Sequence, residues 1–255
     1  MEKHLEEHKS ELKKSFYYFS PKTDCFQKVL LESGITEKII DILNKNKARY
    51  LIVTKGDLST YPHIFKKITK AKDRVQILVS YGMPDEKTRL ILEPQALSLK
   101  KRLAFAKKCK LAGLQVVGIL EPLLPLDDIK YVFKIMDKFK KIGIDHFAID
   151  FMRISNYTLQ KIKTQLPELF VKIESTFNTS DTKKETFRTG PLKERMVVRF
   201  APSEKYLREK FDDIKKYATS INATVSVCNV FNLQNFNKEA GHRGYVCMGI
   251  QTKNN

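Results

Sequence analysis

Polar residues of types that bind ligands follow a series of short apolar runs in this sequence. They are Thr23 and Asp24, Thr54 and Lys55, Ser80, Glu121 and Asp150. If the runs are parallel strands, these side chains meet at the carboxyl edge of one sheet, where βα barrels carry their sites. The spacing therefore predicts a site at this edge. For any one residue taken alone, a helix cap or a loop position is the alternative.

The elements that must position these residues alternate regularly along the chain. Strand-like runs cover about 16–20, 49–54, 75–80, 114–120 and 145–150, and helical patterns cover about 26–46, 58–71, 99–112 and 127–141. Ser59 or Thr60 is the expected N-cap of the second helix and Ser98 that of the third, which Gly113 ends. The alternation predicts an α/β fold with a parallel sheet. Since no GxGxxG follows the first strand, a TIM-like barrel is favoured over an open doubly wound sheet.

The alternation of strand-like and helical runs becomes irregular after Asp150. We therefore predict two regions. We assign residues 1–170 to an incomplete (βα) barrel and residues 171–255 to a small C-terminal α/β extension. Within the extension, the polar stretch 175–189 is expected to be a surface loop or linker. A strand at 196–201, a helix at 203–219 and a strand at 223–228 follow it.

Composition excludes several classes of protein. The 255 residues are 42% hydrophobic, enough for one or two cores, and the net charge is +18. No apolar run approaches the roughly 20 residues of a membrane helix, and the polar, acidic start does not resemble a signal peptide, so a cytoplasmic location without membrane contact is expected. The lysine-rich runs are typical of solvated helix faces, and nucleic-acid binding is the alternative.

The four cysteines indicate neither a disulfide scaffold nor a zinc site. Cys25, Cys109, Cys228 and Cys247 are far apart and form no CxxC pair. They are expected to be reduced thiols, and no metal ligand is predicted.

Three segments resemble spore photoproduct lyase and its radical SAM relatives. They are LEPQALSLKKRLAFAKKCKLAGLQVVGILEPLLPLDD (92–128), SPKTDCFQ (20–27) and LIVTKGDL (51–58), in the family's order. The resemblance covers about residues 12–153. It implies a partial (βα) barrel in which a CxxxCxxC loop holds a 4Fe–4S cluster and the cluster binds S-adenosylmethionine.

The resemblance also implies roles for individual residues. Thr23, Lys55 and Ser80 match family positions that line the S-adenosylmethionine site, with Lys55 at the carboxylate or ribose end of the ligand. Glu93 and Arg102 match a pair that either forms a structural ion pair or contacts the ligand. Asp24 is expected either to bind a ribose hydroxyl or to cap the next helix.

One departure from the family decides how much can be transferred. The sequence contains no CxxxCxxC, and five barrel strands are recognisable where the family has six. We interpret this as loss of the first strand with its cluster loop. Radical chemistry on S-adenosylmethionine, by one-electron reductive cleavage, would then need a separately encoded cluster-bearing segment. The alternatives are a non-catalytic basic barrel that binds nucleic acid or another polyanion, and an aldolase-like barrel with Lys55 as a Schiff-base lysine.

Overall fold

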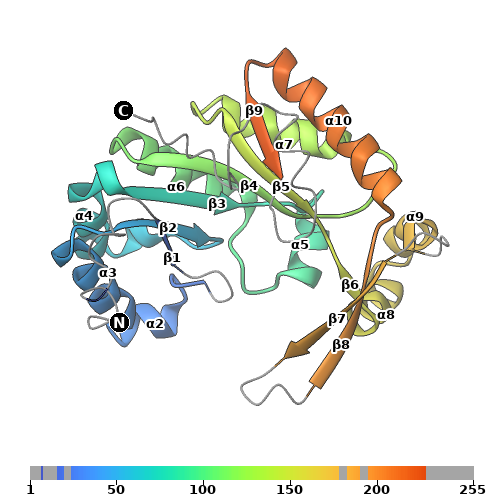
Figure 1. The fold of residues 1–255 in the computed structure, drawn as a ribbon, viewed down its shortest axis with the longest axis horizontal. Coiled ribbons are helices and arrows are strands. Elements are labelled where there is room, and N and C mark those ends of the chain that lie inside the picture. Colours follow the sequence, from blue (N-terminus) through green and yellow to red (C-terminus); the bar gives the residue numbers. More distant parts are fainter. Residues whose placement is uncertain (1–6, 8–15, 20–23, 178–182, 190–194, 228–255) are drawn as a thin grey trace. The chain divides into compact units, whose positions relative to one another are not determined.

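The computed structural model describes residues 7, 16–19, 24–177, 183–189 and 195–227. For residues 183–189 and 195–199 it describes the backbone alone. Thr23, Cys228 and Cys247 lie outside the described residues. The described part divides into two compact units (Figure 1). The first holds residues up to 81 together with 95–119 and 138–145, and the second holds 82–94, 120–137 and 146 onward.

The main sheet confirms the predicted α/β class. Its six strands are ordered β1-β2-β3-β4-β5-β9. They span Phe16–Phe19, Arg49–Thr54, Val75–Ser80, Gln115–Leu123, His146–Phe151 and Thr224–Val227. The pairings of β1 with β2, β2 with β3, β3 with β4 and β5 with β9 are all parallel.

The expected count of five strands is wrong for this sheet. β9, which sequence analysis assigned to the C-terminal extension, pairs in parallel with β5. A missing first strand therefore has no support from the strand count. The division at residue 170 stays a prediction.

Helices of the first unit cover one face of its strands (Figure 1). They are α2 (Lys28–Glu32), α3 (Ile35–Lys45), α4 (Pro62–Lys70) and α6 (Leu99–Leu111), with the short 3-10 turns η1 (Leu58–Thr60) and η2 (Lys72–Arg74). Strand β3 is buried along its whole length, including the polar Gln76 within its otherwise apolar run. Tyr50 of β2 is fully buried, and its hydroxyl donates to Asn44 of α3 (3.1 Å).

Two local predictions in this unit need correction. The single helix expected at 26–46 is two helices, because Gly34 takes a left-handed conformation (φ 71°) that only glycine adopts freely. The cap expected at Ser59 or Thr60 is wrong: Asp57 caps the short turn η1 by accepting from the Ser59 amide, and α4 begins separately at Pro62 after Tyr61, which makes no side-chain cap. The Ser98 cap of α6 is confirmed.

The second unit adds a smaller antiparallel sheet. Its strands, in the order β6-β8-β7, are Ile154–Ser155, Arg195–Ala201 and Lys183–Thr189. The loop predicted at 175–189 is therefore wrong in its described part, since α9 continues to Phe177 and β7 begins at Lys183. Its helices are α5 (Glu86–Leu92), most of α7 (Lys130–Lys140), α8 (Asn156–Gln165), α9 (Pro167–Phe177) and α10 (Glu204–Ser220).

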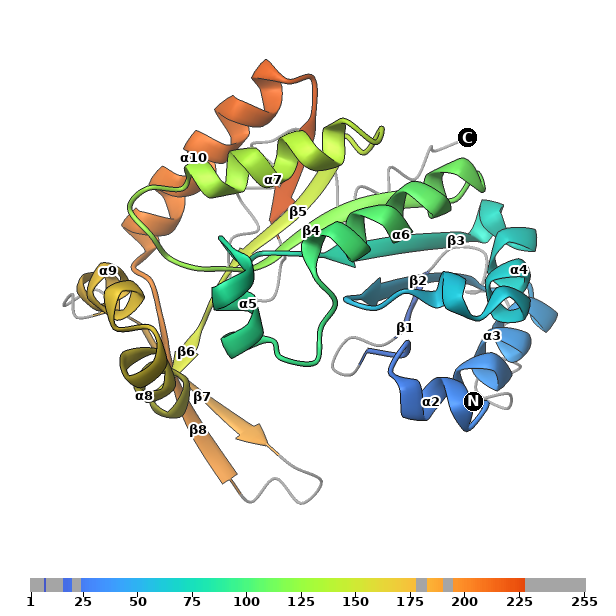
Figure 2. The same ribbon diagram turned by 180° about the vertical axis from the view of Figure 1, so that it is seen from behind.

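Helix α10 runs beside α7 in this unit (Figure 2). The ring of Phe133 stacks on Tyr217 with centroids 4.1 Å apart, and the Tyr217 hydroxyl donates to Asp137 (2.7 Å). No helix in the described residues is long and apolar enough to cross a membrane.

Candidate functional site

Asp24 joins the first two strand ends of the first unit. Its carboxylate accepts the Phe26 amide (2.9 Å) and the Lys55 amide (2.6 Å). It also accepts the Thr54 hydroxyl, which lies 3.0 Å from either carboxylate oxygen. Because these donors come from the loop after β1 and from the end of β2, one side chain fixes both segments.

The turn that follows β2 is held by Thr54 as well. The buried hydroxyl of Thr54 accepts the Gly56 amide (2.8 Å) while it donates to Asp24. A Cβ atom at Gly56 would lie 3.0 Å from Cβ of Phe26 and 3.3 Å from the Thr54 hydroxyl. A side chain at Gly56 would therefore be crowded, and Lys55 lies between two residues that the Thr54 hydroxyl holds together.

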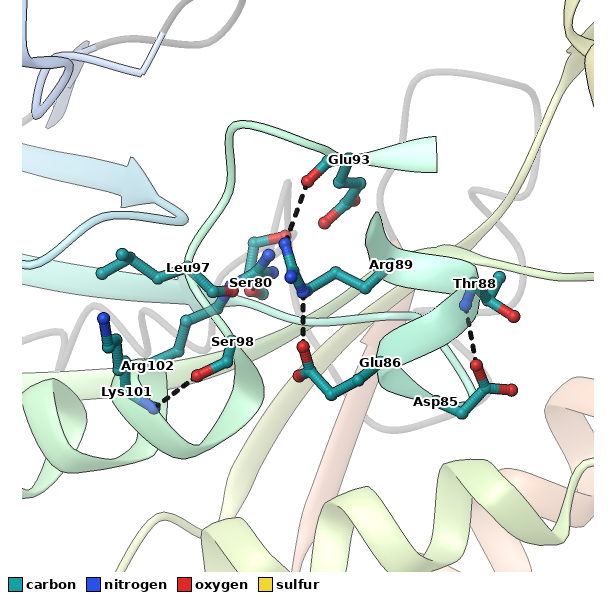
Figure 3. Close-up of polar contacts among 10 residues, drawn as sticks. All are labelled: Ser80, Asp85, Glu86, Thr88, Arg89, Glu93, Leu97, Ser98, Lys101 and Arg102. Carbon is teal, nitrogen blue, oxygen red and sulfur yellow. Dashed lines mark hydrogen bonds and ion pairs between the residues drawn. The ribbon is translucent and has the colours of Figure 1, made fainter. Parts of the chain in front are cut away.

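Arg102 fixes the end of the third strand. This fully buried residue of α6 donates from Nε to the Leu97 carbonyl and from Nη1 to the Ser80 carbonyl, both at 2.6 Å (Figure 3). The Leu97 amide donates to the Lys55 carbonyl at 3.2 Å. The segment before α6 thus connects the end of β3 to the end of β2. This segment and Asp24 together link the ends of β1, β2 and β3. We call the linked residues Asp24, Thr54, Lys55, Ser80, Leu97 and Arg102 the strand-end network.

Four of the predicted site residues belong to this strand-end network: Asp24, Lys55, Ser80 and Arg102. Of the two roles expected for Asp24, the structure shows the one that positions backbone, and contact with a ribose stays a prediction. Ser80 is only 2% exposed, whereas Lys55 is partly exposed. Lys55 is thus more accessible to a ligand than Ser80 is.

Glu93 belongs to the second unit, at the end of α5. Its carbonyl accepts Nη1 of Arg89 (3.2 Å), whose Nε pairs with Glu86 (2.6 Å) (Figure 3). The predicted Glu93–Arg102 pair would join residues of different units and stays a prediction. Thr23 cannot be placed, since it lies outside the described residues.

Sequence reasoning missed two members of the strand-end network. Leu97 contributes through its backbone, which no residue-type pattern reveals. Thr54 was recognised as polar at a strand end, but its role in holding Asp24 was not. The sequence signal for the role of Thr54 was the Thr-Lys-Gly turn. In it, a hydroxyl residue ends the strand and a glycine follows two residues later.

Solved structures of spore photoproduct lyase share this fold. The lyase in complex with a dinucleoside spore photoproduct aligns with a TM-score of 0.61 at 15% identity, over 89% of this chain and 64% of the lyase chain. A doubly substituted lyase with bound AdoMet and the same photoproduct aligns with a TM-score of 0.61 at 16% identity and the same coverage. This likeness confirms the partial radical SAM-type barrel as the fold.

Sequence comparison finds a relative that matches only part of the chain. Uncharacterized protein ORF301 of Acidianus two-tailed virus is 28% identical over 144 residues, which are 54% of this chain and 47% of the viral protein. The chain thus spans about half the length of this curated relative and 64% of the lyase chain. No protein-family model matches the chain.

An iron–sulfur cluster of the lyase type does not fit the described residues. Such a cluster needs three nearby thiolates, and no group of three His, Cys, Asp or Glu that could hold a metal occurs among the residues described. Cys25 and Cys109 are both buried, and burial raises the pKa of the Cys109 thiol to about 12. A thiol that resists ionisation is a poor metal ligand.

Proposed function

We propose that this chain is a barrel protein of the spore photoproduct lyase type that binds S-adenosylmethionine at the carboxyl ends of β1, β2 and β3. The strand-end network carries the proposal. It fixes the Thr54–Gly56 turn that holds Lys55, at the place where the sequence resembles the lyase family. The lyase-like fold, and the AdoMet bound to one of the lyase structures, support the same conclusion.

In this proposal Lys55 makes the direct contact with the ligand. Its ammonium would pair with the ligand's carboxylate, a charge-assisted contact of about 1.5–3 kcal/mol. Asp24 would act as a positioning residue, because both of its carboxylate oxygens already accept hydrogen bonds from the chain. Thr23 and Ser80 are the further polar contacts that the resemblance implies.

The Arg102 contacts would make this site rigid before the ligand arrives. A backbone already held in its bound shape avoids the entropy cost of ordering on binding. Arg102 would therefore contribute by keeping the Ser80 and Leu97 carbonyls in place, and Glu93 is proposed to orient its own loop.

Catalysis would need a cluster that the described residues do not hold. We propose that a separately encoded segment supplies it. Bound S-adenosylmethionine and the cluster would bring one-electron chemistry, and this chain's residues would bind, orient and shield the ligand.

Isothermal titration of the purified chain with S-adenosylmethionine tests the binding site. We expect saturable one-to-one binding that Lys55→Ala weakens roughly tenfold, the effect of losing one charged contact. The matched control is Lys70→Ala on the exposed side of α4, which should leave the affinity unchanged. Absence of saturable binding, or equal effects of the two variants, would overturn the proposal.

A second measurement tests where the cluster comes from. Anaerobic reconstitution of the chain alone with iron and sulfide should give no stoichiometric cluster. A stoichiometric cluster in the chain alone would show that its own cysteines suffice, and the proposed separate segment would be unnecessary.

A further inference from the structure

Positive charge is concentrated in three segments of the first unit. Residues 62–74, 98–113 and 138–145 contain 14 Lys or Arg and two Asp, a net charge of +12 out of the chain's +18. They form α4 with η2, helix α6, and the end of α7 with the turn that follows it. The excess charge of the protein is thus local.

These segments are neighbours in space as well as in charge (Figure 2). Phe65 of α4 and Phe105 of α6 pack with ring centroids 6.3 Å apart. The Lys72 side chain passes within 3.4 Å of the Cβ position of Gly113, and the Lys110 side chain passes within 3.7 Å of that of Gly143. We call the resulting surface the α4–α6 basic face.

The lysines of this face are exposed and lack acidic partners within the described part of the chain. They are Lys66, Lys70, Lys72, Lys100, Lys101, Lys107, Lys110, Lys138 and Lys141. Elsewhere the pattern differs. Lys67 of α4 pairs with Glu37 and Asp41, and Arg208 of α10 pairs with Glu204.

Stabilisation of the helices does not account for these charges. Lysines in the last turns of α4, α6 and α7 are favoured by the helix dipole. Lys100 and Lys101, however, are the second and third residues of α6 after the Ser98 cap, in a first turn that contains no acidic residue. Cations at a helix N-terminus oppose the dipole. Their presence there costs stability and calls for another role.

We propose that the α4–α6 basic face binds the phosphate backbone of a nucleic acid. From Lys100 to Lys110 the helix rises about 15 Å, which matches about four successive phosphates of one strand. Leu111 is the one exposed large apolar residue described in these segments, so the face lacks the apolar side chains that an interfacial helix inserts into lipid. The contact between these lysines and the phosphates depends on charge and not on base sequence. It is independent of the site at the strand ends.

Fluorescence anisotropy of labelled oligonucleotides, titrated with the full chain at several salt concentrations, tests this proposal. Substituting Lys100→Gln, Lys101→Gln and Lys107→Gln together should weaken binding at least tenfold. It should also lower the slope of log affinity against log salt by about two to three, since each lost phosphate contact removes about 0.7–0.9.

The control replaces three exposed lysines of the second unit, Lys172→Gln, Lys205→Gln and Lys216→Gln, with the same change in net charge. It should bind within about twofold of the unmodified chain, because its losses lie outside the contact and long-range attraction is screened. Equal weakening by both triple variants would show a diffuse charge effect and would overturn the assignment.

Stability distinguishes a binding role from a structural one. Lys100→Gln with Lys101→Gln removes cations from the N-terminus of α6, so this variant should melt at the same or a higher temperature while it binds nucleic acid less tightly. A lower melting temperature would contradict the binding role for these lysines. So would absence of nucleic-acid binding at low salt, or tighter binding to anionic vesicles than to oligonucleotides.

Discussion

Helix α6 uses positive charge in opposite ways on its two faces. On the inward face Arg102 is fully buried, and its guanidinium donates to the carbonyls of Leu97 and Ser80. On the outward face Lys100 and Lys107 are exposed, without an acidic partner in the described residues. A buried cation must be matched by acceptors because its desolvation is costly, whereas an exposed cation remains available to an external anion. Burial therefore separates the charges that build the strand-end network from those proposed to bind nucleic acid.

The largest expected effect comes from removing the buried charge. Arg102→Met keeps an unbranched apolar stem but lacks the guanidinium, so the Ser80 and Leu97 carbonyls lose this donor. We expect a loss of about 3 kcal/mol in the free energy of unfolding, since each unsatisfied buried acceptor costs about 1–3 kcal/mol. Urea denaturation measures it. Lys107→Met on the outward face of the same helix is the matched control and should change stability by less than about 0.5 kcal/mol. Similar losses for both would erase the distinction between the faces.

The carboxylate of the strand-end network should rank next. Asp24→Asn keeps the size of the side chain but replaces one acceptor oxygen with an amide group that cannot accept from the Lys55 or Phe26 amide. The expected destabilisation is about 2 kcal/mol, because hydrogen bonds to a charged group are worth about 1.5–3 kcal/mol. Thermal and urea unfolding measure it against Asp73→Asn, which changes an exposed carboxylate of η2. If both substitutions cost the same, Asp24 does not tie the two strand ends.

A double-mutant cycle sharpens the connection within the network. Asp24→Ala removes the acceptor and Thr54→Val removes the donor of the same hydrogen bond, so their combined effect should fall short of the sum by about 1 kcal/mol. Asp24→Asn and Arg102→Met share no direct contact in the hydrogen bonds described above and should add within about 0.5 kcal/mol. Strict additivity of the first pair would mean that Thr54 and Asp24 act separately.

The sequence predicted the local parts of this arrangement better than its long-range parts. The bounds of β2 and β3 followed from mainly apolar runs, which are typical of buried parallel strands. The break at Gly34 was missed because the apolar period continues across it. β7 was missed because its polar sequence lacks a strand pattern, and its pairing with β8 is a tertiary contact that local propensity does not encode.

The same limit applies to the site. Residue type and position at strand ends brought Asp24 and Lys55 together, as the structure has them. The contact of Arg102 with the Ser80 carbonyl spans 22 residues and ends on backbone, so no side-chain pattern could indicate it. Buried arginines find their partners only once the helix is packed.

The smallest expected effect concerns the paired lysine on α4. The hydrogen bond and charge of Lys67 lower the pKa of Glu37, and the bonds to Asp41 and Glu37 raise the pKa of Lys67. A lowered carboxyl pKa contributes stability above the ordinary value of 4.5 that is lost as the pH falls through the lowered value. A raised lysine pKa contributes stability below 10.5 that is lost as the pH rises further.

Lys67→Gln should therefore cost about 0.5 kcal/mol at neutral pH, as exposed ion pairs do, and nothing once Glu37 and Asp41 are protonated. Urea unfolding at neutral and acidic pH measures the difference. Lys70→Gln, one turn away on the basic face and without an acidic partner in the described chain, should show no such pH dependence. A matching pH dependence in Lys70→Gln would mean that Lys70 has an acidic partner of its own. The basic face would then be an ordinary ion-paired surface, with less charge available for a phosphate backbone.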